Sequence, residues 1–312
     1  MKIVTKTIAN RIKLILPDVV DEEQSAFVTR RLITDNALIA MECFHWLIKK
    51  TKGKKGMMAL KLDMAKAYDK MEWGFIEKAL LATGFPQQFT STIMNCISTV
   101  SYQFLINGQP NRNIIPERGI CQGDPISPYV FILCANVLSG MLHKEAQSTN
   151  IHGWQIARGA PKITHLFFAD DSLLFARANQ KEGNTIKLVL HAYQTASGQT
   201  VSLEKSEVSY SRNMPKIEKN MICDRIDVKA ATSHARYLGL LVIFGRSKKD
   251  IFSFVKDRVW KKIKGWKEKC LSRAGKETLI NVVAQAIPTY IMSCYKFPVG
   301  CCDDIEAMLA KF

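Results

Sequence analysis

Two adjacent acidic residues, Asp170 and Asp171, stand between two apolar runs in the segment His165-Leu-Phe-Phe-Ala-Asp-Asp-Ser-Leu-Leu-Phe175. A tight turn between two such runs makes a β-hairpin whose tip carries both carboxylates. The pair could simply initiate the turn, because Asp is common in turns. Paired carboxylates at a hairpin tip also suit a hard divalent cation such as Mg²⁺, which prefers oxygen ligands.

A third acid, Asp63, directly follows the apolar segment 57–62, which is predicted to be a strand. Two strand-borne carboxylate sites that meet can hold two metal ions ~3.5–4 Å apart, where they activate an attacking hydroxyl and stabilise a leaving phosphate oxygen. The matching context of Asp63 and the Asp170–Asp171 pair therefore favours metal-dependent phosphoryl transfer over a solvated acidic turn.

A loop with Gly119, Gly123 and Pro125, in the segment Arg118-Gly-Ile-Cys-Gln-Gly-Asp-Pro-Ile-Ser-Pro128, precedes a long apolar segment. Asp124 or Ser127 can cap the first turn of a helix there, and proline is favoured near a helix start. Gly123 would let a flat ligand approach the backbone closely. A capped core helix explains the apolar residues, but the loop is more polar than a cap requires.

These segments stand in the order and spacing of the palm motifs of reverse transcriptases: Asp63 with Tyr68, then the 118–128 loop, then Phe168-Ala-Asp-Asp171. The chain resembles the reverse transcriptase domain of a plant non-LTR (LINE-type) retrotransposon. The resemblance extends upstream through Gln24-Ser-Ala-Phe-Val28 and downstream to residue 298. It also indicates truncation at both ends, because relatives carry an upstream fingers strand, an endonuclease domain and a downstream tail.

The resemblance implies a metal site and a set of partners. Asp63, Asp170 and Asp171 would bind two Mg²⁺ ions, with Mn²⁺ as a substitute and the backbone carbonyl of Met64 as a further ligand. Lys205 resembles the lysine that acts as general acid for the pyrophosphate leaving group. The implied partners are an RNA template, a DNA primer and deoxynucleoside triphosphates.

Four residues resemble those that contact the incoming nucleotide. Tyr68 takes the place of the steric gate that disfavours a 2′-hydroxyl. Gln122 and Gly123 would touch the nucleotide or the template base, and Arg31 would contact the triphosphate. A solvated surface charge remains the alternative for Arg31, as it does for Lys205. The family usually has glycine where this chain has Arg30, and a position that needs a positive φ would be strained by that change.

The 312-residue chain is basic, with 44 Lys and Arg against 28 Asp and Glu and a net charge of +16. Such an excess favours a polyanionic partner. Residues 246–276 include twelve Lys and Arg but only three Asp and Glu, and apolar residues recur there at helical spacing. A helix there would pack one face and present the other to phosphates or to solvent. The candidate nucleic-acid contacts are Lys256, Lys261, Lys264 and Lys267.

Nine cysteines without a Cys-x-x-Cys pair, and six histidines without ligand spacing, argue against a zinc site or a disulfide framework. They favour a reducing compartment instead. The sequence has no signal peptide and no apolar run of the ~20 residues needed to cross a bilayer. It therefore predicts an intracellular protein of the nucleus or cytoplasm with no membrane partner.

The predicted fold class is α+β, a right-hand polymerase with an antiparallel palm sheet backed by helices. Partial fingers would occupy residues 1–56, the palm 57–245 and a partial thumb 246–312. An amphipathic helix with Ile3, Ile8, Ile12 and Ile15 would open the chain. Strands are predicted near 57–63, 101–107, 112–118, 163–168, 172–176, 207–210 and 237–243, and helices near 74–98, 126–147, 181–196 and from 250 onward.

An RNA-directed DNA polymerase that extends a primer 3′-hydroxyl is the leading functional hypothesis. The second is a catalytically silent remnant that binds nucleic acid without Mg²⁺-dependent extension. A third, an intron maturase, shares the palm motifs but would bind intron RNA selectively. The plant-like segments 60–73 and 274–298 count against the maturase.

Overall fold

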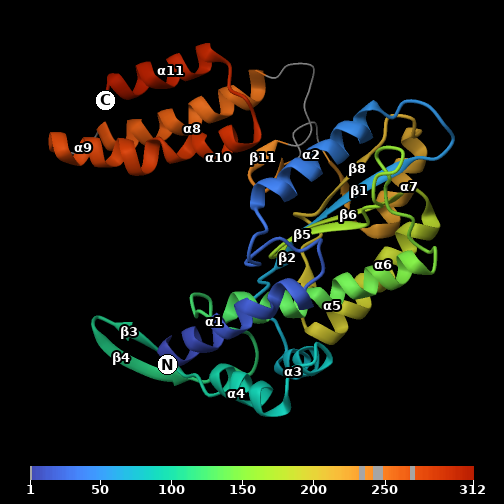
Figure 1. Cartoon of the computed structure of the whole chain (residues 1–312), viewed down its shortest axis with the longest axis horizontal. Helices are drawn as coiled ribbons and strands as arrows, with labels where there is room; N and C mark the ends of the chain where they lie inside the picture. The colour runs from blue at the N-terminus through green and yellow to red at the C-terminus, as the bar shows by residue number, and fades with distance from the viewer. Residues whose placement is uncertain (1, 232–235, 242–248, 268–270) are drawn as a thin grey trace. The chain divides into compact units, whose positions relative to one another are not determined.

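The computed structural model describes residues 2–231, 236–241, 249–267 and 271–312 (Figure 1). The chain divides into two compact units, and each is described by itself. Unit 1 contains Met1–Asn36 and Cys43–Ala231, and unit 2 contains Ala37–Glu42 and Thr232–Phe312. The finer division into fingers, palm and thumb stays a prediction.

A five-stranded sheet in the order β5-β6-β1-β8-β9 is the centre of unit 1. The middle strand β1 (Met57–Leu62) pairs antiparallel with β6 (Asp171–Arg177) on one side and with β8 (Glu207–Tyr210) on the other. The edge strand β5 (His165–Phe168) is antiparallel to β6, and β9 (Lys229–Ala230) runs parallel to β8. The sheet is therefore antiparallel apart from β9, which the sequence did not predict.

Helices α5 (Ser127–Gln147) and α6 (Gln180–Ser197) lie together on one side of this sheet (Figure 1). Both agree with the prediction to within a residue. Helix α6 has clear end signals, because the Asn179 side chain accepts a hydrogen bond from the Glu182 backbone N–H and Gly198 ends the helix with a φ of 74°. The unpredicted helix α7 (Lys216–Ile226) packs against α6.

The helix predicted over 74–98 is two helices, α3 (Trp73–Ala82) and α4 (Gln87–Ser98). Gly84 has a φ of 96°, and Pro86 immediately precedes α4. A left-handed residue followed by a proline cannot continue a helix, so the prediction was wrong at this turn.

The N-terminal helix α1 (Lys2–Val19) exists as predicted, but its buried stripe is shifted. Ile8, Ile12 and Leu16 are buried, at the i, i+4, i+8 positions that share one helix face. Ile3 is 84% exposed and Ile15 is 40% exposed, so neither belongs to the core. Helix α2 (Ile33–Lys49) follows after a loop.

Two small strand pairs complete unit 1. Strands β3 (Tyr102–Ile106) and β4 (Gln109–Ile114) form an exposed hairpin through Asn107 and Gly108, which both have positive φ. The strand predicted at 112–118 therefore begins and ends earlier, because the turn is only two residues long. Strand β2 (Met64–Ala65) pairs with β7 (Thr200–Val201) next to the main sheet.

Unit 2 is mostly helical, with its core on α8 (Lys249–Lys267). Val255, Val259 and Ile263 of α8 are buried, which confirms the predicted helical stripe. Strands β10 (Arg236–Tyr237) and β11 (Leu240–Leu241) pair only with each other among the described strands, so they do not close the palm sheet as predicted. Residues 242 and 243 lie outside the described ranges. The remaining helices are α9 (Arg273–Leu279), a π-helical turn (Ile280–Ala284), α10 (Ala286–Cys294) and α11 (Val299–Ala310).

Within the described ranges, no helix combines the length and the apolar character that crossing a membrane requires.

Candidate functional site

The sheet brings the three predicted acids to one end. Leu62 of β1 pairs with Ser172 of β6, so Asp63 and Asp171 each lie one residue beyond that pair. Phe168 of β5 pairs with Asp171, which leaves Ala169 and Asp170 as the two-residue tip of the hairpin. Ala169 has a φ of 53°, a left-handed conformation that tight hairpin turns require.

Negative charge accumulates at this end of the sheet. Burial raises the pKa of Asp171, and the neighbouring carboxylates of Asp170 and Asp63 raise it further, while Lys61 acts in the opposite direction. Lys205 brings its Nζ to 3.9 Å from Asp63 Oδ1, but its side chain is 72% exposed, so screening by solvent weakens this pair. Carboxylates held together against their repulsion are a donor set that suits divalent cations.

The spacing of the three carboxylates is wider than that of a compact single-ion site. In the part of the chain that the structure describes, they are not among the side-chain groups whose donor atoms all lie within 4.8 Å of one another. A pair of ions ~3.5–4 Å apart needs such a wider set of ligands.

The backbone of Asp63 is fixed by the segment that carries Lys205. The Asp63 N–H donates to Ser206 Oγ at 3.2 Å, and the Asp63 carbonyl accepts from the Ser202 N–H at 2.7 Å. Ser206 Oγ in turn donates to the Ser202 carbonyl at 2.8 Å. Met64, the predicted carbonyl ligand, follows in β2 and pairs with β7. Lys205 belongs to this 202–206 turn, so the same bonds bring it beside Asp63 although the two residues are distant in sequence.

Tyr68 is positioned between the core and the acids. Its ring stacks on Phe131 of α5, with centroids 4.8 Å apart and an interplanar angle of 7°. Burial raises the pKa of Tyr68 to about 12, and the nearby Asp170 contributes to that rise. The Tyr68 carbonyl also accepts a hydrogen bond from the Ile120 N–H at 3.0 Å, which ties it to the glycine-rich loop.

The glycine-rich loop before α5 lies open at Gln122 and Gly123, and both residues are exposed. Gly123 has a φ of 95°, and no other protein atom lies within 4 Å of the place of a Cβ, so the space beside it is free for a ligand. Asp124 Oδ1 accepts from the Ile126 N–H at 3.1 Å, whereas Ser127 Oγ donates to the Cys121 carbonyl at 2.7 Å. Both bonds stabilise the loop, and the predicted side-chain cap is absent, because the N-cap residue of α5 is Ile126.

A hollow of about 400 Å³ opens beside this loop. Gln122 and Arg118 contribute to its walls, and Gly119 lies at its base against the backbone of Asp69. A Cβ on Gly119 would meet the Asp69 carbonyl oxygen at 2.6 Å, so only glycine allows this contact.

Arg31 has a different set of contacts from the one predicted. Its guanidinium donates to the backbone carbonyls of Asp21, Gln24 and Val20, all in the loop after α1. These bonds hold the loop together, and the triphosphate contact stays a prediction. The preceding Arg30 has a φ of 68°, so this position does require the left-handed conformation that glycine favours.

Two residues that support the hairpin were missed by sequence reasoning as positioning groups. Gln24 is buried, and its Oε1 accepts from the Ala26 N–H at 2.9 Å and from the Ala169 N–H at 3.1 Å. Asn36 Nδ2 donates to the Phe167 carbonyl at 2.8 Å. Both contacts join segments more than 100 positions apart, and no local pattern signals them.

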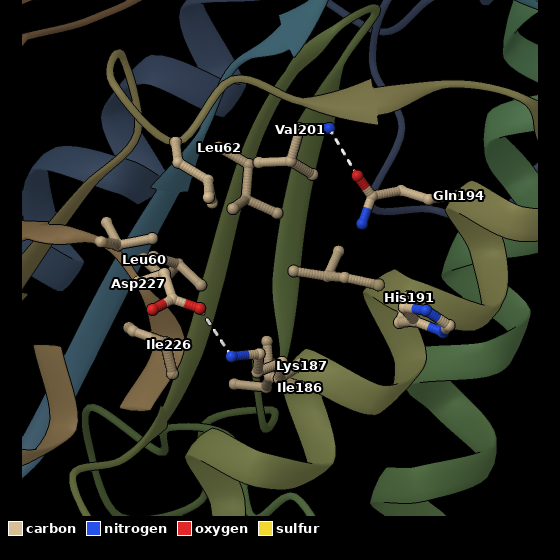
Figure 2. Close-up of a pocket in the computed structure, with 12 residues that line it drawn as sticks. Leu60, Leu62, Ile186, Lys187, His191, Gln194, Val201, Ile226 and Asp227 are labelled. Atoms are coloured by element: carbon tan, nitrogen blue, oxygen red, sulfur yellow. Dashed lines mark hydrogen bonds and ion pairs between the residues drawn. The ribbon is translucent and has the colours of Figure 1, made fainter. Parts of the chain in front are cut away.

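An apolar pocket of about 160 Å³ lies on the helix-covered face of the sheet (Figure 2). Leu60 and Leu62 of β1 contribute to it, and Lys187 and Asp227 pair at 2.6 Å at its edge. The three aspartates are not among its lining residues. It is a gap between sheet and helices and takes no part in the acidic site.

The lysines of α8 differ in their surroundings. Lys256 Nζ pairs with Asp304 Oδ2 of α11 at 2.8 Å, which raises the pKa of Lys256. Lys261 and Lys264 are exposed, and the side chain of Lys267 lies outside the described part of the chain. Unit 2 therefore presents Lys261 and Lys264 as candidate phosphate contacts, and holds Lys256 in an ion pair.

Comparison with known proteins gives consistent matches. The family model described as "Reverse transcriptase (RNA-dependent DNA polymerase)" matches residues 1–242. An R2 retrotransposon Pol polyprotein of Popillia japonica is 28% identical over 204 residues, which are 63% of this chain and 32% of that protein. The R2 Pol polyprotein of Nasonia vitripennis is 30% identical over 51% of this chain and 14% of its own length. An uncharacterized mitochondrial protein of Arabidopsis thaliana is 46% identical over 69 residues, 22% of this chain and 57% of that protein.

The fold also resembles solved structures. The apo telomerase of Candida tropicalis, truncated from its C-terminal domain, gives a TM-score of 0.52 at 13% identity and covers 77% of this chain and 44% of that one. The longer apo telomerase of the same organism gives 0.51 at 12% identity, over 100% of this chain and 51% of that one. This likeness confirms the predicted α+β right-hand polymerase fold. The chain spans only part of each relative.

Proposed function

Because this chain belongs to the reverse transcriptase family, we propose that it is the polymerase core of a non-LTR retrotransposon and extends a primer 3′-hydroxyl along an RNA template. The observation that carries the proposal is the convergence of Asp63 from β1 with Asp170 and Asp171 from the β5–β6 hairpin at one end of the sheet. Relatives among R2 retrotransposon polyproteins support the same assignment.

Asp63, Asp170 and Asp171, with the carbonyl of Met64, would hold two divalent ions, Mg²⁺ or Mn²⁺. When bound, these ions lower the pKa of the attacking hydroxyl and stabilise the leaving oxygen. The three carboxylates would determine where the two ions bind. The Ser202–Ser206 turn fixes the position of Asp63, and the two-residue hairpin tip fixes that of Asp170. Lys205, close to Asp63, would donate a proton to the pyrophosphate as it leaves.

The nucleotide would lie over Tyr68 and the exposed loop at Gln122 and Gly123. Tyr68 is held rigid by its stack on Phe131, which is what a steric gate against a 2′-hydroxyl needs. Gly123 leaves room for a base or sugar to approach the backbone. A triphosphate contact by Arg31 would require its guanidinium to exchange at least one of its four carbonyl partners.

Template and primer would bind through the backbone phosphates that basic residues recognise. Lys261 and Lys264 are exposed on α8, and Lys267 follows them in sequence, so these are the proposed phosphate contacts. Lys256 would contribute only if its pair with Asp304 opened. The net charge of +16 agrees with a nucleic-acid partner, and we place the protein in the nucleus or cytoplasm.

Primer extension on an RNA template, with purified protein and MgCl₂, tests the proposal. Asp63→Asn and Asp170→Asn keep the size of the side chain and remove its charge, so extension is expected to fall at least about a hundredfold while template binding persists. Asp224→Asn, an exposed carboxylate on α7, is the matched control and should extend normally.

Near-normal extension by either aspartate variant would contradict the metal-site assignment. Template binding by the unmodified chain without any Mg²⁺-dependent extension would instead identify a silent nucleic-acid-binding remnant.

A further inference from the structure

A second polar cluster lies at the start of β5, whereas the aspartates follow its end. Asp21 and Glu23 come from the loop after α1, Ser139 and His143 from one face of α5, and His165 from β5. From His165 to Phe168 the strand rises about 10 Å, and Asp170 lies beyond it at the tip of the hairpin. The two clusters are therefore distinct sites on one hairpin.

The cluster contains a set of metal-ligating side chains. Glu23, His143 and His165 each offer a donor atom within 4.8 Å of the others, and within the described ranges they are the one group of three or more such side chains that meets this condition. Glu23 Oε1 lies 3.0 Å from His143 Nε2, and the two imidazole rings have centroids 5.0 Å apart. Two imidazoles and one carboxylate match the ligand sets that hold zinc in proteins.

His165 has the surroundings of a metal ligand. Its side chain is fully buried. Its Nδ1 lies 2.8 Å from Thr164 Oγ1, and a hydroxyl there can accept the Nδ1–H and leave the Nε2 lone pair free. Nε2 lies 2.8 Å from Ser139 Oγ, on the side of α5 that also carries His143.

The hydrogen-bond network sets the imidazole tautomer of the metal-free protein. Ser139 Oγ donates its single proton to Asp21 Oδ2 at 2.6 Å. His165 Nε2 therefore carries the imidazole proton and donates to Ser139 Oγ, and the Ser139 hydroxyl would have to turn away from Nε2 before this nitrogen could bind a cation. A shift of the imidazole proton from Nε2 to Nδ1, toward Thr164, prepares the ring to bind a cation with no net change of charge.

The cluster is accessible from solvent. Glu23, His143 and Thr164 line a pocket of about 440 Å³. His143 is about one-third exposed, so an ion can reach the carboxylate and imidazole from this pocket and contact the buried His165 behind them. Three protein ligands and an open side leave a fourth position for water.

We propose that Glu23, His143 and His165 form a zinc-type metal site, separate from the Mg²⁺ site of the three aspartates and independent of the proposed polymerase activity. Imidazole nitrogen favours zinc and related transition metals, whereas Mg²⁺ requires oxygen ligands, so the two sites select different ions. The ion would join the loop after α1 to α5 and β5. That loop also carries Gln24, whose side chain supports the Ala169 N–H beside Asp170.

The sequence argued against zinc because its histidines share no ligand spacing. The three ligands come from three separate segments, with 120 positions between Glu23 and His143, so only the fold brings them together.

Metal content of the purified full chain tests the site. The protein is loaded with ZnCl₂, dialysed in the presence of excess MgCl₂ and measured by inductively coupled plasma mass spectrometry. About one zinc ion per chain is expected. His143→Gln and Glu23→Gln should each weaken zinc binding by roughly a hundredfold or more. Loss of a group that only hydrogen-bonds to a metal ligand already lowers affinity about 10–100-fold. Thr164→Val, which removes the partner of His165 Nδ1, should weaken it roughly tenfold or more.

Three controls make the result specific. His191→Gln changes an exposed histidine outside the cluster, and Thr195→Val changes an exposed threonine of α6, so both should keep the zinc. Asp170→Asn should also keep it. Loss of zinc in Asp170→Asn would place the ion at the aspartates and overturn the proposal, as would equal zinc content in His143→Gln and the unmodified chain. Far-ultraviolet circular dichroism and the absorption of a Co²⁺-substituted sample distinguish loss of a ligand from loss of the fold.

Discussion

Each end of strand β5 carries a cluster of polar side chains, and the two clusters differ in whether their members are hydrogen-bonded to one another or repel one another. At its start, Asp21, Ser139 and His165 satisfy one another through hydrogen bonds of 2.6 and 2.8 Å. Beyond its end, Asp170 and Asp171 are adjacent like charges, and Asp63 adds a third. In the metal-free protein, hydrogen bonds satisfy the polar groups of the first cluster, whereas the second cluster holds like charges that a bound cation would balance.

The difference separates groups that stabilise the fold from groups that perform chemistry. A buried polar group with its partners in place contributes to a unique structure, and the loss of one partner leaves the other unpaired. The Asp170 and Asp63 carboxylates raise the pKa of Asp171, and like charges held together work against folding, so their presence at one point calls for a functional reason. Substitutions at the two ends should therefore have opposite effects on activity and on stability.

The largest expected effect is on the activity of Asp171→Asn. Removal of this carboxylate should lower primer extension by at least about a hundredfold, because the charge that balances the cations is lost. Burial and the neighbouring carboxylates raise the pKa of Asp171, so the folded state disfavours its ionised form. The stability linked to this group is present at low pH and is lost as the pH rises through the raised pKa.

Asp171→Asn should therefore be as stable as the unmodified chain, or more stable, at neutral pH without metal, and this advantage should shrink toward about pH 4. Chemical unfolding across this pH range provides the measurement. A variant that is clearly less stable at pH 7 would show that Asp171 has a stabilising partner, and the contrast between the two ends of β5 would fail.

Gln24→Met should have the next largest effect, because Gln24 lies between the two clusters. Methionine has a similar length but cannot accept hydrogen bonds from the Ala26 and Ala169 N–H groups. The hairpin tip should loosen, and a displacement of about 1 Å at a reacting group can cost a hundredfold in rate. We expect extension to fall by roughly tenfold to a hundredfold, mostly in kcat.

Gln103→Met, an exposed glutamine of β3, is the matched control for Gln24→Met and should extend normally. Steady-state extension over a range of deoxynucleotide concentrations separates kcat from KM. If Gln24→Met raised only KM, Gln24 would act on nucleotide binding instead of on the position of Asp170.

Ser139→Ala tests the other end of β5. The substitution removes the hydroxyl that bonds both Asp21 Oδ2 and the buried His165 Nε2, and the unpaired imidazole should cost about 1–3 kcal/mol of unfolding free energy. Extension by the remaining folded protein should change little. Ser101→Ala, at an exposed position, controls for the loss of a hydroxyl. An unchanged denaturation midpoint would mean that the network does not stabilise the fold.

The aspartate end of β5 could be predicted from the sequence, and the histidine end could not. Apolar runs on both sides of Asp170–Asp171, and the strand before Asp63, are local patterns with period two, so they fix the strands and the hairpin tip. The helices over 127–147 and 180–197 were likewise predicted to within a residue from local sequence patterns. The break at Gly84–Pro86 was also local, and it was overlooked.

The contacts of Gln24, Asn36, Ser139 and His165 depend on packing between segments far apart in the chain, and single residues carry no signal for such partners. For the same reason, the role expected for Arg31 differs from its observed contacts. A planar guanidinium suits phosphate, but backbone carbonyls of its own loop lie closer in this structure.

The smallest effect is expected at Arg30, in the loop that connects the two clusters. Arg30 is exposed and has a φ of 68°, a conformation that costs a residue with a Cβ and that glycine adopts freely. Arg30→Gly should therefore raise the unfolding free energy by about 0.5–1 kcal/mol, even though glycine makes the unfolded chain more flexible. Arg30→Ala removes the same side chain but keeps the Cβ, so it should give no such gain. Urea denaturation of the two variants side by side decides the matter, since equal stability of Arg30→Gly and Arg30→Ala would mean that the loop relaxes away from the left-handed conformation.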